Sequence, residues 1–101
     1  MRRGEIWRYE PVAARPGQSS LRLIVSADAI NNNPDLPVVL SVHVVDTDPG
    51  SLLATRVGEY GWARALSIEP VLRRRLTERV GQADAAVMDA VASTLRAVQD
   101  L

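Results

Sequence analysis

The sequence predicts a small, mainly β protein of the α+β class, a β-barrel with an α-helix at its C-terminal end. Apolar residues before residue 81 occur in short runs with period-two alternation, and proline, glycine and aspartate separate these runs. Residues 82–101 contain neither glycine nor proline and repeat apolar residues at spacings of three and four. Short strands followed by one helix fit a small capped barrel. A chain of 101 residues supplies one hydrophobic core, so we expect a single domain over residues 1–101.

The first expected strand lies near the N-terminus and places Ile6 toward the core, with Trp7 and Tyr9 together on the opposite face. Residues 11–20 contain two prolines, one glycine and two serines, which predict a long loop with Arg15 at its centre. Long loops often carry function, but exposed arginines without a role are equally common, so both interpretations stay open for Arg15.

The next two strands, 21–25 and 38–45, form the expected central pair, and a polar turn that contains two prolines connects them. Arg22 lies on the first of these strands and His43 on the second, and each interrupts a run of apolar neighbours. Because polar side chains interrupt otherwise apolar strands here, we expect a partly solvated cleft across the pair. This cleft is the first candidate for a site of chemistry.

The remaining β segments alternate between strands and turns. Turns are expected at 46–50, 58–61 and 70–74, and strands at 51–57, 62–68 and 76–80. Glu69 and Pro70 are expected to end the strand 62–68, since proline removes a backbone donor.

The C-terminal stretch 82–101 predicts an amphipathic helix, whose apolar stripe consists of Val87, Val91, Leu95 and Val98. Such a stripe is ordinarily part of the core, and a face that binds a partner protein is the alternative.

Composition excludes several classes of site. The chain has no cysteine, which excludes disulfides, thiolate nucleophiles and cysteine-ligated metals, and a single histidine does not favour a zinc site. We therefore expect no metal and no cofactor. No apolar run reaches the length of about 18 residues that spans a membrane, and the N-terminus shows no signal-peptide pattern, so we expect a cytoplasmic protein.

The formal net charge is zero, which by itself does not indicate a nucleic-acid-binding protein. All 12 basic residues are arginine, however, and the arginine fork suits phosphate and carboxylate better than an ammonium group does. A genomic codon bias explains the same composition.

The order of several short motifs resembles the MazF/PemK family of toxins from type II toxin–antitoxin systems. The resemblance covers nearly the whole chain and rests on Arg3-Gly4-Glu5-Ile6-Trp7, Gly17, Leu23-Ile24-Val25-Ser26 leading to Asn31, Val38 to Val45, Ala63 to Ile68, Arg75-Leu76 and Val80-Gly81 before the final helix.

This resemblance implies a homodimeric SH3-like or CcdB-like barrel that cuts single-stranded RNA at short sequences without a metal and is silenced by a cognate antitoxin. In the family, the ribose 2′-hydroxyl attacks the adjacent phosphate and leaves a cyclic phosphate and a 5′-hydroxyl. Such a reaction needs a proton acceptor, a proton donor and positive charge beside the phosphorane.

Two positions depart from the family pattern. The family uses an arginine at the start of the second strand and a threonine at the end of the third. Alignment on Leu23 to Ser26 places Ser20 at the arginine position, and the same treatment of the third strand places Val45 at the threonine position.

Arg22 and Thr47 lie two residues beyond these positions and are the candidate catalytic replacements, together with His43. Arginine stays protonated, so Arg22 would stabilise charge, whereas His43 would act as the acid or base. The alternatives are structural: an ion pair of Arg22 with Asp46 or Asp28, a backbone hydrogen bond of Thr47 in its turn, and a histidine that only packs.

The expected RNA-binding residues are Trp7, Arg15 and Ser20. Trp7 would stack on an unpaired base, although aromatic residues at a strand end also serve as core or dimer contacts.

Two further functions stay open on the same fold. One is a catalytically degenerate toxin that keeps its contacts with an antitoxin or with nucleic acid, as the residues at positions 20 and 45 suggest. The other is a CcdB-like protein that binds a topoisomerase, but the C-terminal residues 97–101 lack the aromatic terminus that such binding uses.

Overall fold

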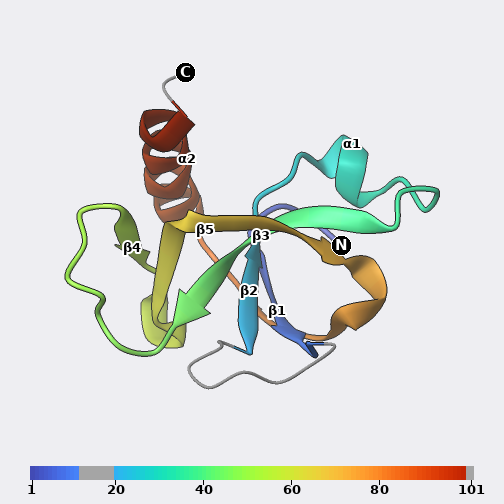
Figure 1. The fold of residues 1–101 in the computed structure, drawn as a ribbon, viewed down its shortest axis with the longest axis horizontal. Coiled ribbons are helices and arrows are strands. Elements are labelled where there is room, and N and C mark those ends of the chain that lie inside the picture. The colour runs from blue at the N-terminus through green and yellow to red at the C-terminus, as the bar shows by residue number, and fades with distance from the viewer. Residues whose placement is uncertain (12–19, 100–101) are drawn as a thin grey trace.

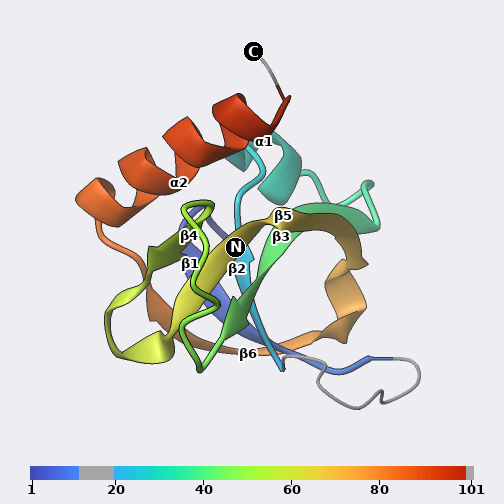
Figure 2. The ribbon, with the colours of Figure 1, turned by 60° about the vertical axis from the view of Figure 1, so that its left-hand side comes forward.

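The computed structural model describes residues 1–11 and 20–99, and it contains six strands and two α-helices (Figure 1). The strands form one antiparallel sheet in the order β4-β5-β3-β2-β1-β6. In chain order the elements are β1 (Glu5–Tyr9), β2 (Leu21–Ile24), α1 (Asp28–Asn31), β3 (Val38–Val45), β4 (Ala54–Arg56), β5 (Trp62–Leu72), β6 (Leu76–Gln82) and α2 (Ala85–Gln99). The sheet is strongly curved, with β5 and β6 on opposite sides in Figure 2. The predicted mainly β fold with a C-terminal helix is confirmed.

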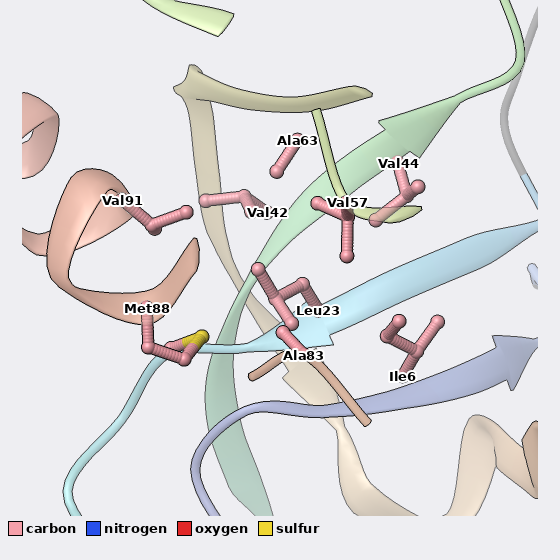
Figure 3. Packing of buried hydrophobic residues seen from close by; sticks show 9 residues of the cluster. All are labelled: Ile6, Leu23, Val42, Val44, Val57, Ala63, Ala83, Met88 and Val91. Atoms are coloured by element: carbon pink, nitrogen blue, oxygen red, sulfur yellow. The ribbon is translucent and has the colours of Figure 1, made fainter. Parts of the chain in front are cut away.

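Both faces of the sheet bury apolar side chains. The first cluster lies between the sheet and α2 (Figure 3) and consists of Ile6, Leu23, Val42, Val44, Val57, Ala63, Ala83, Met88 and Val91. The second cluster lies on the other face and consists of Ile24, Val39, Val71 and Leu76, against which Met1, Trp7 and Tyr9 pack. Alternation in β1 and β2 sends neighbouring side chains to opposite clusters, as the sequence pattern predicts.

The predicted C-terminal helix begins three residues later than expected, since Gln82 still belongs to β6. Asp84 marks the start, because its carboxylate accepts the backbone N–H of Val87 at 2.9 Å and satisfies a free donor of the first turn. The stripe packs against the first cluster through Val87, Val91 and Leu95, so the core interpretation of the helix is correct.

Truncation of this stripe is expected to reduce stability. Leu95 is only partly buried, so we expect Leu95→Ala to lower the free energy of unfolding by about 1 to 2 kcal/mol, below the ~2 to 5 kcal/mol of a fully buried leucine. Urea denaturation measures the change. Leu52→Ala is the matched control, because the Leu52 side chain is 100% exposed and its truncation should change nothing. Equal losses in the two variants would show that α2 does not dock in this way.

The strand expected at 62–68 does not stop at Glu69 and Pro70, because β5 runs on to Leu72. Pro70 lies opposite Leu40 of β3. The Leu40 carbonyl accepts the N–H of Val25 and its N–H donates to Ser26, so both backbone groups point away from β5. The missing N–H of Pro70 therefore costs no ladder hydrogen bond, and the strand continues.

Two other expectations need correction. The strand expected at 51–57 is only three residues long, Ala54–Arg56, because Ser51 forms a turn in which its hydroxyl accepts the N–H of Leu53 at 3.0 Å. The turn expected between β2 and β3 contains the short helix α1, and Arg73 donates to four backbone carbonyls in that segment. Those contacts hold α1 in place from a residue more than 40 positions away.

Candidate functional site

Three strands bring Arg22, His43 and Glu69 together on the face of the second cluster. Arg22 of β2 lies directly opposite His43 of β3 in the antiparallel register, so the two side chains share a face, as the sequence predicted. His43 Nε2 lies 2.8 Å from Glu69 Oε1 of β5, and Arg22 Nε lies 3.5 Å from the same oxygen. One carboxylate therefore joins the histidine to the arginine.

A bulge in β5 supplies Glu69. On β3 a single residue separates Ser41 from His43, whereas on β5 four residues separate their partners Glu69 and Arg64. Ser67 lies within this bulge, where its hydroxyl accepts the backbone N–H of His43 at 2.9 Å and donates to the Arg64 carbonyl at 2.6 Å. The bulge therefore ties the backbone of His43 to the strand that carries its carboxylate partner.

Arg22 does not lie in a solvated cleft, which corrects the expectation for this residue. Its side chain is 0% exposed, its guanidinium carbon lies 4.4 Å from the centre of the Tyr9 ring, and Nη1 donates to the Leu21 carbonyl at 3.0 Å. Burial lowers the pKa of Arg22, and the charge of Glu69 opposes that shift. The ion pair is made with Glu69, and not with Asp46 or Asp28 as the structural alternative proposed. In this conformation a phosphate cannot touch the guanidinium.

His43 is partly open to solvent, with 23% of its side chain exposed. Burial lowers the pKa of His43 below its ordinary value of 6.5, and the positive charges of Arg22 and Arg64 lower it further. The hydrogen bond and the charge of Glu69 act in the opposite direction without reversing the shift. A pKa below 6.5 favours the neutral imidazole over the protonated one at pH 7, and the neutral form is the one that accepts a proton.

Arg64 is the exposed cation beside His43, and sequence reasoning missed it. Arg64 lies opposite His43 in the register of β3 and β5, and it lines a shallow pocket of about 80 Å³ with Ala54, Leu66 and residues of the 49–53 segment. The available signal was its position between two buried alanines of β5, which requires its side chain to point out of the first cluster.

The other expected site residues lie at the edge of this group or outside it. Trp7 lies opposite Arg22 and is half-buried, and its indole N–H donates to Glu5 at 3.1 Å. Ser20 is exposed, and its carbonyl accepts the N–H of Tyr9. Thr47 is exposed in the turn after β3, where its hydroxyl donates to Asp46 at 3.3 Å. Arg15 lies outside the described residues.

The structure thus brings Arg22 and His43 together and adds Glu69 and Arg64.

Within residues 1–11 and 20–99, no group of three or more histidine, aspartate or glutamate side chains is arranged to hold a metal ion. Over the same residues, no helix has the length and apolar character needed to cross a membrane.

Comparison with known proteins identifies a family by sequence and several solved structures by fold. The sequence profile of PemK-like, MazF-like toxins of type II toxin–antitoxin systems matches residues 2–99. No curated protein matches the chain by sequence. Among solved structures, an endoribonuclease from a mycobacterial species is 23% identical, with a TM-score of 0.82 over 100% of this chain and 92% of that chain.

Two further solved structures are also similar in fold. A mycobacterial endoribonuclease in complex with its cognate antitoxin is 23% identical, with a TM-score of 0.83 over 100% of this chain and 96% of that chain. MazF from Deinococcus radiodurans is 19% identical, with a TM-score of 0.77 over 99% of this chain and 96% of that chain. At these identities the likeness establishes the fold.

Proposed function

Because the chain belongs to the PemK-like, MazF-like toxin family of type II toxin–antitoxin systems, we propose that it is a sequence-specific endoribonuclease that cuts single-stranded RNA without a metal ion. The observation that carries this proposal is the partly exposed His43, held by a carboxylate and flanked by arginines from two strands. The full-length likeness in fold to endoribonucleases supports the same activity.

The proposed reaction is an intramolecular transesterification, in which a phosphate of the RNA exchanges its bond to the 5′-oxygen for a bond to the neighbouring 2′-oxygen. Neutral His43 takes the proton of a ribose 2′-hydroxyl, and the 2′-oxygen forms a bond to the adjacent phosphorus. The bond from phosphorus to the 5′-oxygen then breaks, and the proton returns to that oxygen from the imidazolium, directly or through water. The products are a 2′,3′-cyclic phosphate and a 5′-hydroxyl, and no net proton is consumed.

Positive charge beside the phosphorane comes from two arginines with different positions. Arg64 is exposed next to His43, so it is the guanidinium that contacts the phosphate directly. Arg22 is buried on the strand next to His43, so it acts through its charge and through Glu69 rather than by contact. We keep Thr47 as a proposed catalytic residue, whose hydroxyl would have to approach from the turn after β3 and pass the imidazolium proton on to the 5′-oxygen.

The RNA strand would run across this face of the sheet. Trp7 lies on the same face as Arg22, where its ring can stack on an unpaired base. We keep Ser20 and Arg15 as proposed contacts of the RNA strand, and Arg15 belongs to the segment outside the described residues. We further propose that the toxin works in the cytoplasm as a homodimer and that a cognate antitoxin protein silences it. Structures of similar toxins with MazE or a cognate antitoxin support the last point.

A catalytically degenerate toxin is the second candidate function. The burial of Arg22 and the hydrogen bond of Thr47 to Asp46 favour it, since neither residue is placed to touch a phosphate. Such a protein would keep its contacts with the antitoxin or with nucleic acid and would not cut RNA.

Incubation of the pure protein with a long single-stranded RNA in EDTA tests the proposal. We expect cuts at a short recurring sequence, with new 5′ ends that polynucleotide kinase labels directly because they carry hydroxyl groups. The mapping of these ends gives the recognition sequence. If the RNA stays intact although thermal melting shows that the protein is folded, the result would instead support the degenerate toxin.

A further inference from the structure

We propose that Glu69 is a positioning residue, which fixes the proton of neutral His43 on Nε2 and leaves Nδ1 as the atom that accepts the proton of the 2′-hydroxyl. This inference rests on the proposed ribonuclease function, and it adds a residue that lies outside the two family positions considered above. It concerns the protein before RNA binds, so part of it is testable without any cleavage assay.

The argument begins with the contact between the two side chains. His43 Nε2 lies 2.8 Å from Glu69 Oε1, which is a hydrogen-bond distance. An ionised carboxylate only accepts hydrogen bonds, so the hydrogen in this contact belongs to the imidazole. A neutral imidazole carries a single N–H, and the hydrogen on Nε2 therefore leaves the lone pair on Nδ1.

Glu69 is itself held by its surroundings. The buried Arg22 approaches the same carboxylate oxygen at 3.5 Å, and the Ser67 hydroxyl links the β5 bulge to the backbone of His43. The Glu69 side chain is 43% exposed, so without these contacts it would sample several rotamers in water. The charge of Arg22 also offsets that of Glu69, which reduces repulsion between the carboxylate and an RNA phosphate.

The other charged groups around His43 cannot replace Glu69. Arg22 on β2 and Arg64 on β5 are donors only, and Tyr9 on β1 packs on the guanidinium of Arg22. The Ser67 hydroxyl already accepts the backbone N–H of His43. Among the described neighbours, the carboxylate of Glu69 is therefore the acceptor that selects the tautomer, and its loss frees the imidazole to carry its proton on either nitrogen.

The first test is nitrogen NMR of protein labelled with ¹⁵N-histidine. The chain contains a single histidine, so every imidazole signal reports on His43. Above the pH at which the ring titrates, we expect the wild-type protein to carry its proton on Nε2, and Glu69→Gln to show a mixture of both tautomers. Glu78→Gln is the matched control, because Glu78 pairs with Arg8 on the exposed surface of β6 and should leave the spectrum unchanged. A wild-type proton on Nδ1 would overturn the inference, whether or not the variant folds.

The second test measures RNA cleavage by the same three proteins and by Glu69→Asp. We expect Glu69→Gln to cleave about 10²-fold more slowly at pH 7, which is the lower end of the contribution of a general base. Its pH–rate profile should also rise at lower pH, since the carboxylate that favours protonated His43 is lost. Glu69→Asp keeps a carboxylate, which only accepts hydrogen bonds, whereas the glutamine amide both accepts and donates, so the aspartate variant should recover part of the rate.

The outcomes separate the inference from the function on which it rests. A wild-type protein that cuts RNA, with Glu69→Gln equal to it in rate and pH profile, would overturn the role of Glu69 and leave the ribonuclease intact. The wild-type tautomer on Nε2 in a protein that does not cut RNA would uphold the placement of the proton and overturn the proposed function.

Discussion

Replacement of His43 by glutamine is expected to lower the rate of RNA cleavage by about 10² to 10⁴, which is the range that a positioned general acid or base contributes. Glutamine can still donate a hydrogen bond to Glu69 from its amide, so the local structure is retained while the titrating group is lost. The rate constant on a single-stranded RNA, measured in EDTA at pH 7 with enzyme in excess, reports the chemical step.

The control for this variant is Glu78→Gln, an equally small change on the exposed surface of β6. Thermal melting of both variants verifies that they are folded. If His43→Gln stays within about threefold of the wild-type rate, the imidazole is not the acid or base, and the large contribution expected of such a group is absent.

Replacement of Arg22 by alanine is expected to reduce stability strongly, by about 2 to 3 kcal/mol. Removal of one partner of a buried ion pair costs about 3 to 5 kcal/mol when the other charge stays buried, but the partner Glu69 is 43% exposed and regains hydration. The loss of the contact with Tyr9 and of the hydrogen bond to the Leu21 carbonyl adds to the cost. Urea denaturation of the two proteins measures the difference.

Arg64→Ala is the matched comparison for Arg22→Ala. Arg64 is exposed, so its loss should leave stability within about 0.5 kcal/mol of the wild type and weaken RNA cleavage instead. An Arg22→Ala protein with unchanged stability would mean that the guanidinium is solvated in solution. Arg22 could then contact a phosphate directly.

The sequence predicted the strands that obey local alternation. Alternation along β1, β2 and β3 assigns their side chains to the two faces of the sheet, so that Ile6, Leu23 and Val42 belong to the first cluster and Trp7, Ile24 and Val39 to the second. The C-terminal helix follows from its stripe in the same way. The prediction of these elements requires no information about which strands become neighbours in the sheet.

The sequence did not predict β5 beyond residue 68 or the bulge within it. Whether Pro70 ends a strand depends on where the backbone groups of its partner Leu40 point, and that direction is set by β2. The number of residues in the bulge depends on the pairing of β3 with β5, which no local pattern reveals. Glu69 was therefore taken for the end of a strand, although it is a partner of His43.

The sequence predicted only the part of the site that lies on strands consecutive in the chain. Arg22 and His43 come from consecutive strands, so their common face could be inferred from the sequence. The burial of Arg22 could not, because it requires Tyr9 and the second apolar cluster to cover a face that looked half-polar. Arg64 was overlooked because β5 does not follow β3 directly in the chain, so no local pattern showed that Arg64 lies opposite His43.

The pH–rate profile of RNA cleavage in EDTA tests most directly that neutral His43 is the base. Burial holds the pKa of His43 below 6.5, and protonated imidazole cannot accept a proton, so the rate should fall in acid and rise with pH through that pKa. We expect the rate to level off above that pKa and the residual activity of His43→Gln to show no such inflection. A wild-type rate that is flat from about pH 5 to 8, or that begins to rise only above about pH 8, would contradict this account.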